Sequence, residues 1–123
     1  MSQPVGPYTP IVRAGPWLIC SGQIALVDGT LLDGDLPAQV TQALKNVATL
    51  LESQGSGLSD VVKTTVFLTD MADFSAMNEA YVAAFGDHRP ARSAFAVVGL
   101  PLGARVEIEA WAFTSGSPAN PAG

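Results

Sequence analysis

The segment "RVEIEAWAF", residues 105–113, constrains the fold most, because its side chains alternate strictly in character. Successive residues of a β-strand point to opposite faces of a sheet. One face of this strand carries four small aliphatic residues: Val106, Ile108, Ala110 and Ala112. The opposite face carries two carboxylates and two large aromatic rings: Glu107, Glu109, Trp111 and Phe113. The aliphatic face is suited to lie beneath helices, and the other face then needs a different cover.

Two segments show the apolar periodicity of amphipathic helices, residues 35–54 and 73–85. Asp35 is suited to cap the first helix, Pro37 to its first turn and Gly55 to its end. Gly86 follows the second helix directly. Each helix buries one side, so together they cover one face of a sheet.

Runs rich in β-branched and aromatic residues predict strands over residues 17–24, 61–68, 93–98 and 105–114, with a weaker strand over 8–13. The turn "GLPLG", residues 99–103, is interpreted as a hairpin connection between the last two strands. The expected order is β-β-α-β-α-β-β, an α+β fold with one mixed sheet and two helices packed on one face. We expect a single domain over residues 1–114, followed by a disordered Pro/Gly/Ser-rich tail at 115–123.

Composition argues against several classes of function. Six Lys and Arg stand against eleven Asp and Glu, so the net charge of −5 argues against binding a nucleic-acid backbone. One histidine, His88, and one cysteine, Cys20, are too few for the usual ligand sets of a zinc site. We expect His88 in a solvated loop and Cys20 in the core, in a reducing compartment. No signal-peptide pattern and no apolar run of roughly 20 residues is found, which predicts a cytoplasmic protein without membrane contact.

Apolar residues make up 48% of the chain and charged residues only 14%. A charged fraction this low indicates that part of the surface is buried elsewhere, most simply in an oligomer. Trp111 and Phe113 lie on the strand face that the helices cannot cover. We therefore expect a partner subunit to cover them.

The stretch "RPARSAF", residues 89–95, places Arg92 at the entrance of the predicted strand 93–98. If the hairpin interpretation holds, the neighbouring strand carries Glu107, about 4.8 Å away, and both side chains converge on one small ligand. A guanidinium binds a carboxylate through two parallel hydrogen bonds, and a carboxylate on partly dry surface can act as a general base on water. A surface ion pair for Arg92 and a solvated position for Glu107 are the simpler alternatives.

Several motifs resemble the Rid family of reactive intermediate deaminases, also called YjgF or L-PSP proteins. They are "GPY" (residues 6–8), "SGQI" (21–24), "VVKTTVFLTDMADFSAMNEAY" (61–81), "PARSAF" (90–95) and "VEIEA" (106–110). Each short motif is weak by itself, but their order and spacing together are specific. The resemblance extends over residues 6–113, nearly the whole expected domain.

This resemblance implies a chorismate-mutase-like homotrimer with ligand clefts between subunits. Members hydrolyse enamines and imines, such as 2-aminoacrylate and 2-iminopropanoate, to 2-oxo acids and ammonia, and no metal or organic cofactor is implied. By resemblance, Arg92 holds the substrate carboxylate, Glu107 activates the hydrolytic water and Tyr8 closes the cleft. Four further positions contact substrate by the same comparison: Ser21, Gly22, Asn78 and Ala94.

Two departures from the family pattern leave other functions open. Ala94 stands where archetypal members have cysteine, and the stretch from Asn78 to Arg92 is a few residues shorter than in the archetype. A specialised pathway deaminase of the aminomuconate type is one alternative. A non-catalytic ligand-binding or chaperone-like trimer is another, although it would not need a base such as Glu107. Endoribonuclease activity ranks last because of the negative charge.

Overall fold

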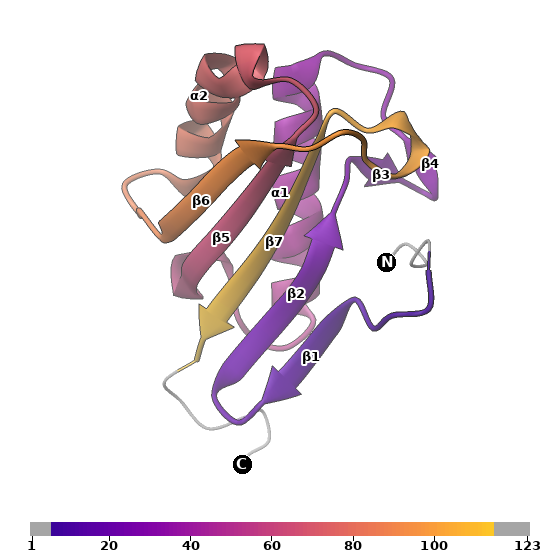
Figure 1. Cartoon of the computed structure of the whole chain (residues 1–123). Coiled ribbons are helices and arrows are strands. Elements are labelled where there is room, and N and C mark those ends of the chain that lie inside the picture. Colours follow the sequence, from indigo (N-terminus) through magenta and orange to yellow (C-terminus); the bar gives the residue numbers. More distant parts are fainter. Residues whose placement is uncertain (1–5, 115–123) are drawn as a thin grey trace.

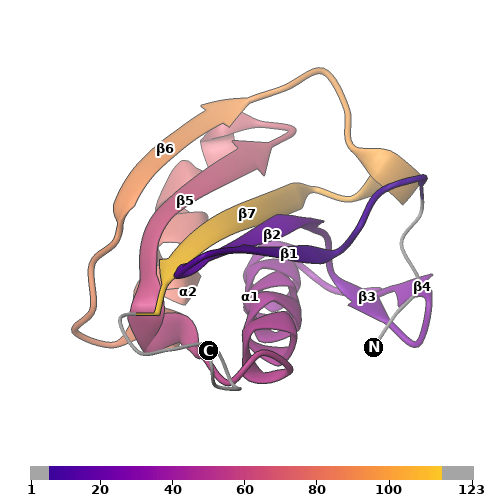
Figure 2. The same cartoon turned by 90° about the horizontal axis from the view of Figure 1, so that it is seen from below.

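The computed structural model describes residues 6–114, which form a five-stranded mixed sheet and two α-helices (Figure 1). The strands of this sheet are β1 (Ile11–Ala14), β2 (Trp17–Gln23), β5 (Val61–Leu68), β6 (Ala91–Ala96) and β7 (Val106–Phe113), and the helices are α1 (Leu36–Glu52) and α2 (Phe74–Phe85). Figure 2 shows both helices on the same side of the curved sheet. The expected α+β arrangement is therefore confirmed. The tail predicted at 115–123 lies outside the described residues.

Both helices begin and end within two residues of the predicted bounds. The Asp35 carboxylate accepts a hydrogen bond from the Ala38 amide at 3.0 Å and caps α1, and proline occupies the first turn. Gly86 ends α2 with a φ of +66°, a left-handed conformation that favours glycine. Local capping chemistry therefore sets these boundaries.

The core lies between the sheet and the two helices, and β7 is its central strand. The strand order is β1-β2-β7-β5-β6, so β7 pairs with β2 on one side and β5 on the other. All four small aliphatic residues of β7 are fully buried: Val106, Ile108, Ala110 and Ala112. The face assignment made from the alternation is confirmed.

The predicted hairpin between the last two long strands is wrong. β6 pairs only with β5, in parallel, and β5 separates it from β7. The elements β5, α2 and β6 form a β-α-β unit, which returns the chain parallel to its first strand. Residues 97–105 then pass the end of β5, where Val97 donates to the Leu68 carbonyl at 2.7 Å and Thr69 donates to the Arg105 carbonyl at 3.2 Å. The turn "GLPLG" lies in this crossing connection.

A small second hairpin that the sequence analysis missed lies between β2 and α1. It consists of β3 (Leu26–Val27) and β4 (Thr30–Leu31). Asp28 and Gly29 form its turn with φ values of +52° and +82°. An Asp-Gly pair in this conformation is typical of two-residue hairpins, so the dipeptide itself was the available signal.

The sheet face opposite the helices is rich in partly exposed aromatic rings. Trp111 and Phe113 are 42% and 40% exposed, and both make edge-to-face contacts with Trp17 at centroid distances of 5.9 and 5.2 Å. Within residues 6–114, neither helix has the length and apolar character that crossing a membrane requires.

Candidate active site

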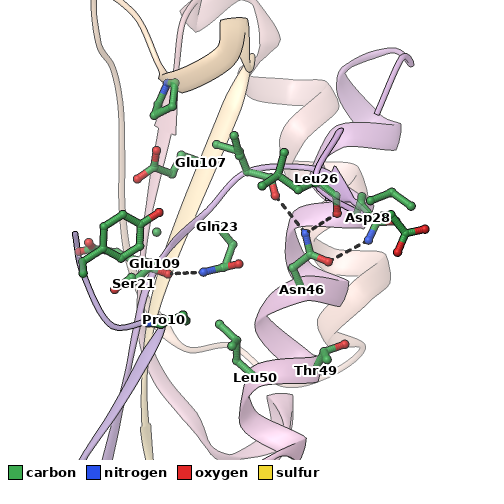
Figure 3. A pocket seen from close by; sticks show the side chains of 17 residues that line it. Pro10, Ser21, Gln23, Leu26, Asp28, Asn46, Thr49, Leu50, Glu107 and Glu109 are labelled. Atoms are coloured by element: carbon green, nitrogen blue, oxygen red, sulfur yellow. Dashed lines mark hydrogen bonds between the residues drawn. The ribbon is translucent and has the colours of Figure 1, made fainter. Parts of the chain in front are cut away.

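An open cavity of about 800 Å³ lies beside the end of β2 (Figure 3). Four of the seven predicted site residues line it: Tyr8, Ser21, Gly22 and Glu107. Glu109 also lines this cavity, whereas no lysine or arginine does so among the described residues. The structure therefore brings together the tyrosine, the strand backbone and the candidate base, within one chain.

Glu107 rests directly on the backbone of β2 at Gly22. The pairing of β2 with β7 shifts register between Cys20 and Gln23, which is the position of a β-bulge. A Cβ atom at Gly22 would overlap Oε2 of Glu107 and lie 2.7 Å from its Cδ. Because glycine has no Cβ, the carboxylate of Glu107 can occupy this space. Gly22 thus sets the position of Glu107 through close approach.

The environment of Glu107 disfavours its ionised form. Burial, and to a lesser extent the negative charge of Glu109, raise the pKa of Glu107 above its ordinary value. A carboxylate with a raised pKa holds a proton more readily and is a stronger base once ionised.

Arg92 lies on β6, and its side chain turns toward α2. Its Cζ lies 4.9 Å from the ring centroid of Tyr81 and 5.6 Å from that of Phe74, and Nη1 donates to the Met77 sulfur at 3.7 Å. The only ion pair within residues 6–114 joins Arg105 and Asp73, so no described carboxylate pairs with Arg92. The guanidinium is therefore held by aromatic rings with its charge uncompensated.

Ala94 lies on the same strand as Arg92, and Asn78 lies on the helix whose side chains contact Arg92. Ala94 is the second residue after Arg92 on β6 and packs against the core from the same side. Asn78 follows Met77 on α2, and its Oδ1 is buried without a hydrogen-bond partner among the described residues. These three predicted residues form a second group, separate from the cavity that contains Glu107.

The expectation that Arg92 and Glu107 converge within one chain is wrong. Arg92 pairs with Thr64 of β5, whose side chain is buried toward the helices. Glu107 pairs with Phe67 of the same strand and lies on the face that the helices leave uncovered. The two groups are therefore separated by β5 and by the sheet itself. The cause is the strand order, which the hairpin interpretation had wrong.

Helix α1 contributes four cavity residues that sequence reasoning missed: Gln42, Asn46, Thr49 and Leu50. Asn46 donates from Nδ2 to the carbonyls of Ile24 and Leu26 at 3.1 and 3.0 Å, and Gln42 donates to Asn46 Oδ1 at 2.9 Å (Figure 3). These bonds fasten the chain after β2 to α1 and so support the cavity wall. Two amide side chains spaced i, i+4 beside an apolar helix face were the signal in the sequence.

The single cysteine and the single histidine lie in structural positions. Cys20 is buried as expected, and burial raises the pKa of its thiol to about 12, which leaves it protonated and unreactive. His88 is half-buried rather than solvated, because its Nε2 lies 2.6 Å from the Val61 carbonyl oxygen. Within residues 6–114, no group of three His, Cys, Asp or Glu could hold a metal ion.

Replacing Gly22 tests its contact with Glu107. We expect Gly22→Ala to push the carboxylate of Glu107 away from β2 toward solvent, which lowers its pKa toward the ordinary value. Because a flexible side-chain end yields to the new methyl group, the melting temperature should change little. Carboxyl-carbon NMR titration measures the first effect and calorimetry the second. Gly57→Ala is the matched control, since its φ of −165° is extended and a Cβ there meets no atom within 4 Å. An unchanged pKa of Glu107 in Gly22→Ala would contradict the contact.

Comparison with known proteins gives a consistent set of similarities. Residues 1–114 match a family model described as Endoribonuclease L-PSP. A RutC family protein of Pyrococcus horikoshii is 43% identical over 113 residues, covering 90% of both chains. The mouse 2-iminobutanoate/2-iminopropanoate deaminase is 44% identical over 108 residues, covering 86% of this chain and 80% of the mouse protein.

Solved structures show the same fold. A Thermotoga maritima protein superposes with a TM-score of 0.87 at 44% identity, covering 91% of this chain and 90% of its own. Escherichia coli TdcF, solved with bound serine, superposes with a TM-score of 0.86 at 36% identity, covering 91% of each chain. Related proteins also include one named as mitochondrial in Schizosaccharomyces pombe and one named as chloroplastic in Arabidopsis thaliana. The chorismate-mutase-like fold expected from the sequence is confirmed by these likenesses.

Proposed function

The chain belongs to the L-PSP family, also called the YjgF, RidA or RutC family, and on that premise we propose that it hydrolyses 2-enamino and 2-imino acids to 2-oxo acids and ammonia. This proposal rests mainly on the position of Glu107. Its carboxylate has a raised pKa and lies in a cavity that Tyr8, Ser21 and Gly22 also line. The mouse and human relatives named as 2-iminobutanoate/2-iminopropanoate deaminases support the substrate class. The reaction needs no metal or organic cofactor.

We further propose a homotrimer whose clefts combine the two separated groups. One subunit would supply Arg92, Ala94 and Asn78, and its neighbour would supply Glu107 and the cavity. Two observations support this assembly: the two groups lie apart within one chain, and the uncovered sheet face carries exposed Trp111 and Phe113. Burial of such rings stabilises interfaces between subunits. The cytoplasmic location inferred from the sequence stays a prediction.

The proposed chemistry uses one positive and one negative group. Arg92 binds the substrate carboxylate through its planar fork, which places the adjacent C=N carbon at a defined point. Glu107 takes a proton from water as the water oxygen bonds to that carbon. The C=N π pair moves onto the nitrogen, which takes that proton back from Glu107. Glu107 then transfers the remaining hydroxyl proton to the nitrogen, and the C–N bond breaks to release ammonia as the C=O bond forms. Tyr8 closes the cleft, and the backbone at Ser21 and Gly22 forms its floor.

Direct assay of the imine tests this function. A dehydratase generates 2-aminoacrylate, semicarbazide traps the remaining imine, and pyruvate is read by a coupled dehydrogenase. We expect the protein to lower the trapped fraction, Glu107→Gln to reduce kcat about 10²- to 10⁴-fold, and Arg92→Lys to reduce kcat/KM about tenfold or more. Lys45→Ala is the charge control, because Lys45 is exposed and outside both groups. A trapped fraction unaffected by the wild-type protein, over a range of imino acids, would contradict the proposal and leave the ligand-binding trimer in its place.

Mixed trimers test whether the cleft lies between subunits. Arg92→Ala and Glu107→Gln should each be inactive alone, yet co-expression of the two chains should restore activity. Random assembly places an intact Arg92 opposite an intact Glu107 in about a quarter of the clefts. Light scattering should report a particle of three 12.7 kDa chains. Absence of any recovery in mixed particles of that mass would contradict a cleft that combines Arg92 of one subunit with Glu107 of its neighbour.

The fall of kcat/KM at low pH, the acid limb of the pH–rate profile, tests whether Glu109 raises the pKa of Glu107. If Glu107 acts as the base, kcat/KM falls as pH decreases through its raised pKa, because the protonated form cannot accept a proton. Glu109→Gln removes the like charge, which lowers the pKa of Glu107 and moves this limb to lower pH. Asp33→Asn is the control, because it makes the same charge change outside the cavity. The pH at which kcat/KM falls should be unchanged in this variant. A Glu109→Gln variant that loses activity while Glu107→Gln keeps it would instead make Glu109 the base.

Endoribonuclease activity, the word in the family model's description, has less support in this chain. Three acidic residues line the cavity, Asp28, Glu107 and Glu109, and no lysine or arginine does so among the described residues. Such a surface repels a phosphodiester backbone.

A further inference from the structure

We infer that Tyr81 is a positioning residue for Arg92: its buried ring forms the platform on which the guanidinium lies. The inference rests on the proposed function, because it takes Arg92 as the group that binds the substrate carboxylate. It adds a residue that touches no substrate and acts only through Arg92.

The contacts of Arg92 come from one face of α2. Phe74, Met77 and Tyr81 are spaced i, i+3 and i+7, so their side chains lie along the same side of the helix. The guanidinium carbon is nearer to the Tyr81 centroid, at 4.9 Å, than to that of Phe74, at 5.6 Å. Both distances are within the range of cation–π attraction. Tyr81 therefore makes the closer of the two ring contacts.

The Tyr81 ring is itself fixed from β5. It is only 4% exposed, and its hydroxyl lies 2.6 Å from Oγ1 of Thr64, which is fully buried. Thr64 is also the residue of β5 that pairs with Arg92 across the parallel strands. The pairing of β5 with β6 therefore places Thr64, which holds the Tyr81 ring, next to Arg92. Phe85 packs on the other part of Tyr81 with a centroid distance of 4.7 Å.

An aromatic platform orients an arginine without neutralising it. If a carboxylate held Arg92, a substrate carboxylate would have to displace it, whereas a ring leaves the guanidinium N–H groups available. Burial raises the pKa of Tyr81, although the Thr64 hydrogen bond and the charge of Arg92 oppose this, so the phenol stays neutral. A guanidinium held in this way has lost rotamer freedom before substrate arrives, which favours binding.

Variants of Tyr81 separate the ring from its hydroxyl. Tyr81→Leu removes the π face, and we expect the Kd for 2-oxobutanoate and the KM for 2-iminobutanoate to rise about two- to thirtyfold. Because the platform acts through carboxylate binding, kcat at saturation should stay within about twofold. Tyr81→Phe keeps the ring and should stay within about twofold of wild type in Kd and KM. Calorimetry with 2-oxobutanoate and steady-state kinetics provide these values.

Phe85→Leu is the matched control for lost packing. Phe85 is buried and touches Tyr81, but among the described residues its ring makes no cation–π contact with Arg92. It should lower the melting temperature and leave the Kd unchanged. If Tyr81→Leu does not fold, Phe74→Leu removes the half-exposed second ring, and its Kd should still rise, by a smaller factor.

Three results would overturn the inference. They are an unchanged Kd in Tyr81→Leu, an equal rise in Phe85→Leu, and, where Tyr81→Leu does not fold, an unchanged Kd in Phe74→Leu. If the wild type is active and Arg92→Ala no longer binds 2-oxobutanoate, those results reject the role of Tyr81 and leave the proposed function standing. If the wild type neither turns over imino acids nor binds 2-oxobutanoate, the proposed function fails, and the platform fails with it.

Discussion

The packing of β7 between β2 and β5 is the constraint on which the rest of the structure depends. Its aliphatic residues are fully buried in the core between the sheet and the helices. Because strand side chains alternate, the same packing forces Glu107 and Glu109 onto the uncovered face. A register shift of one residue would bury both carboxylates under the helices, which the core would not tolerate. The position of the candidate base is thus a consequence of core packing.

The strand order also keeps the two charged groups of the site apart. With β5 between their strands, Arg92 and Glu107 cannot form an ion pair within one chain. Such a pair would hold the pKa of Glu107 low and occupy the N–H groups of Arg92. Instead the pKa of Glu107 is raised, and Arg92 has no carboxylate partner in the described part of the chain. In the proposed trimer, substrate would lie between two groups that do not neutralise each other.

Each of these two charged side chains is positioned by neighbouring residues. Gly22 provides space for the Glu107 carboxylate, since any side chain there would overlap it. On the other side of the sheet, Thr64 holds Tyr81, and Tyr81 supports Arg92. The pairing of β2 with β7 determines the first arrangement, and the pairing of β5 with β6 determines the second. Pre-organisation of this kind lowers the ordering cost of binding.

The sequence by itself determined the features that depend on local chemistry. Alternation assigned the two faces of β7, Asp35 and Gly86 marked helix ends, and short motifs predicted Arg92 and Glu107 as candidate site residues. Strand neighbours were decided only by the tertiary structure, because β6 and β7 could each pair with several strands of similar composition. Burial of the aliphatic face placed β7 at the centre of the sheet, and the β5-α2-β6 crossover left β6 at its edge. Strand pairing is non-local, and it decides which side chains become neighbours. The separation of Arg92 from Glu107 and the contact of Arg92 with Tyr81 therefore had no signature in the local sequence.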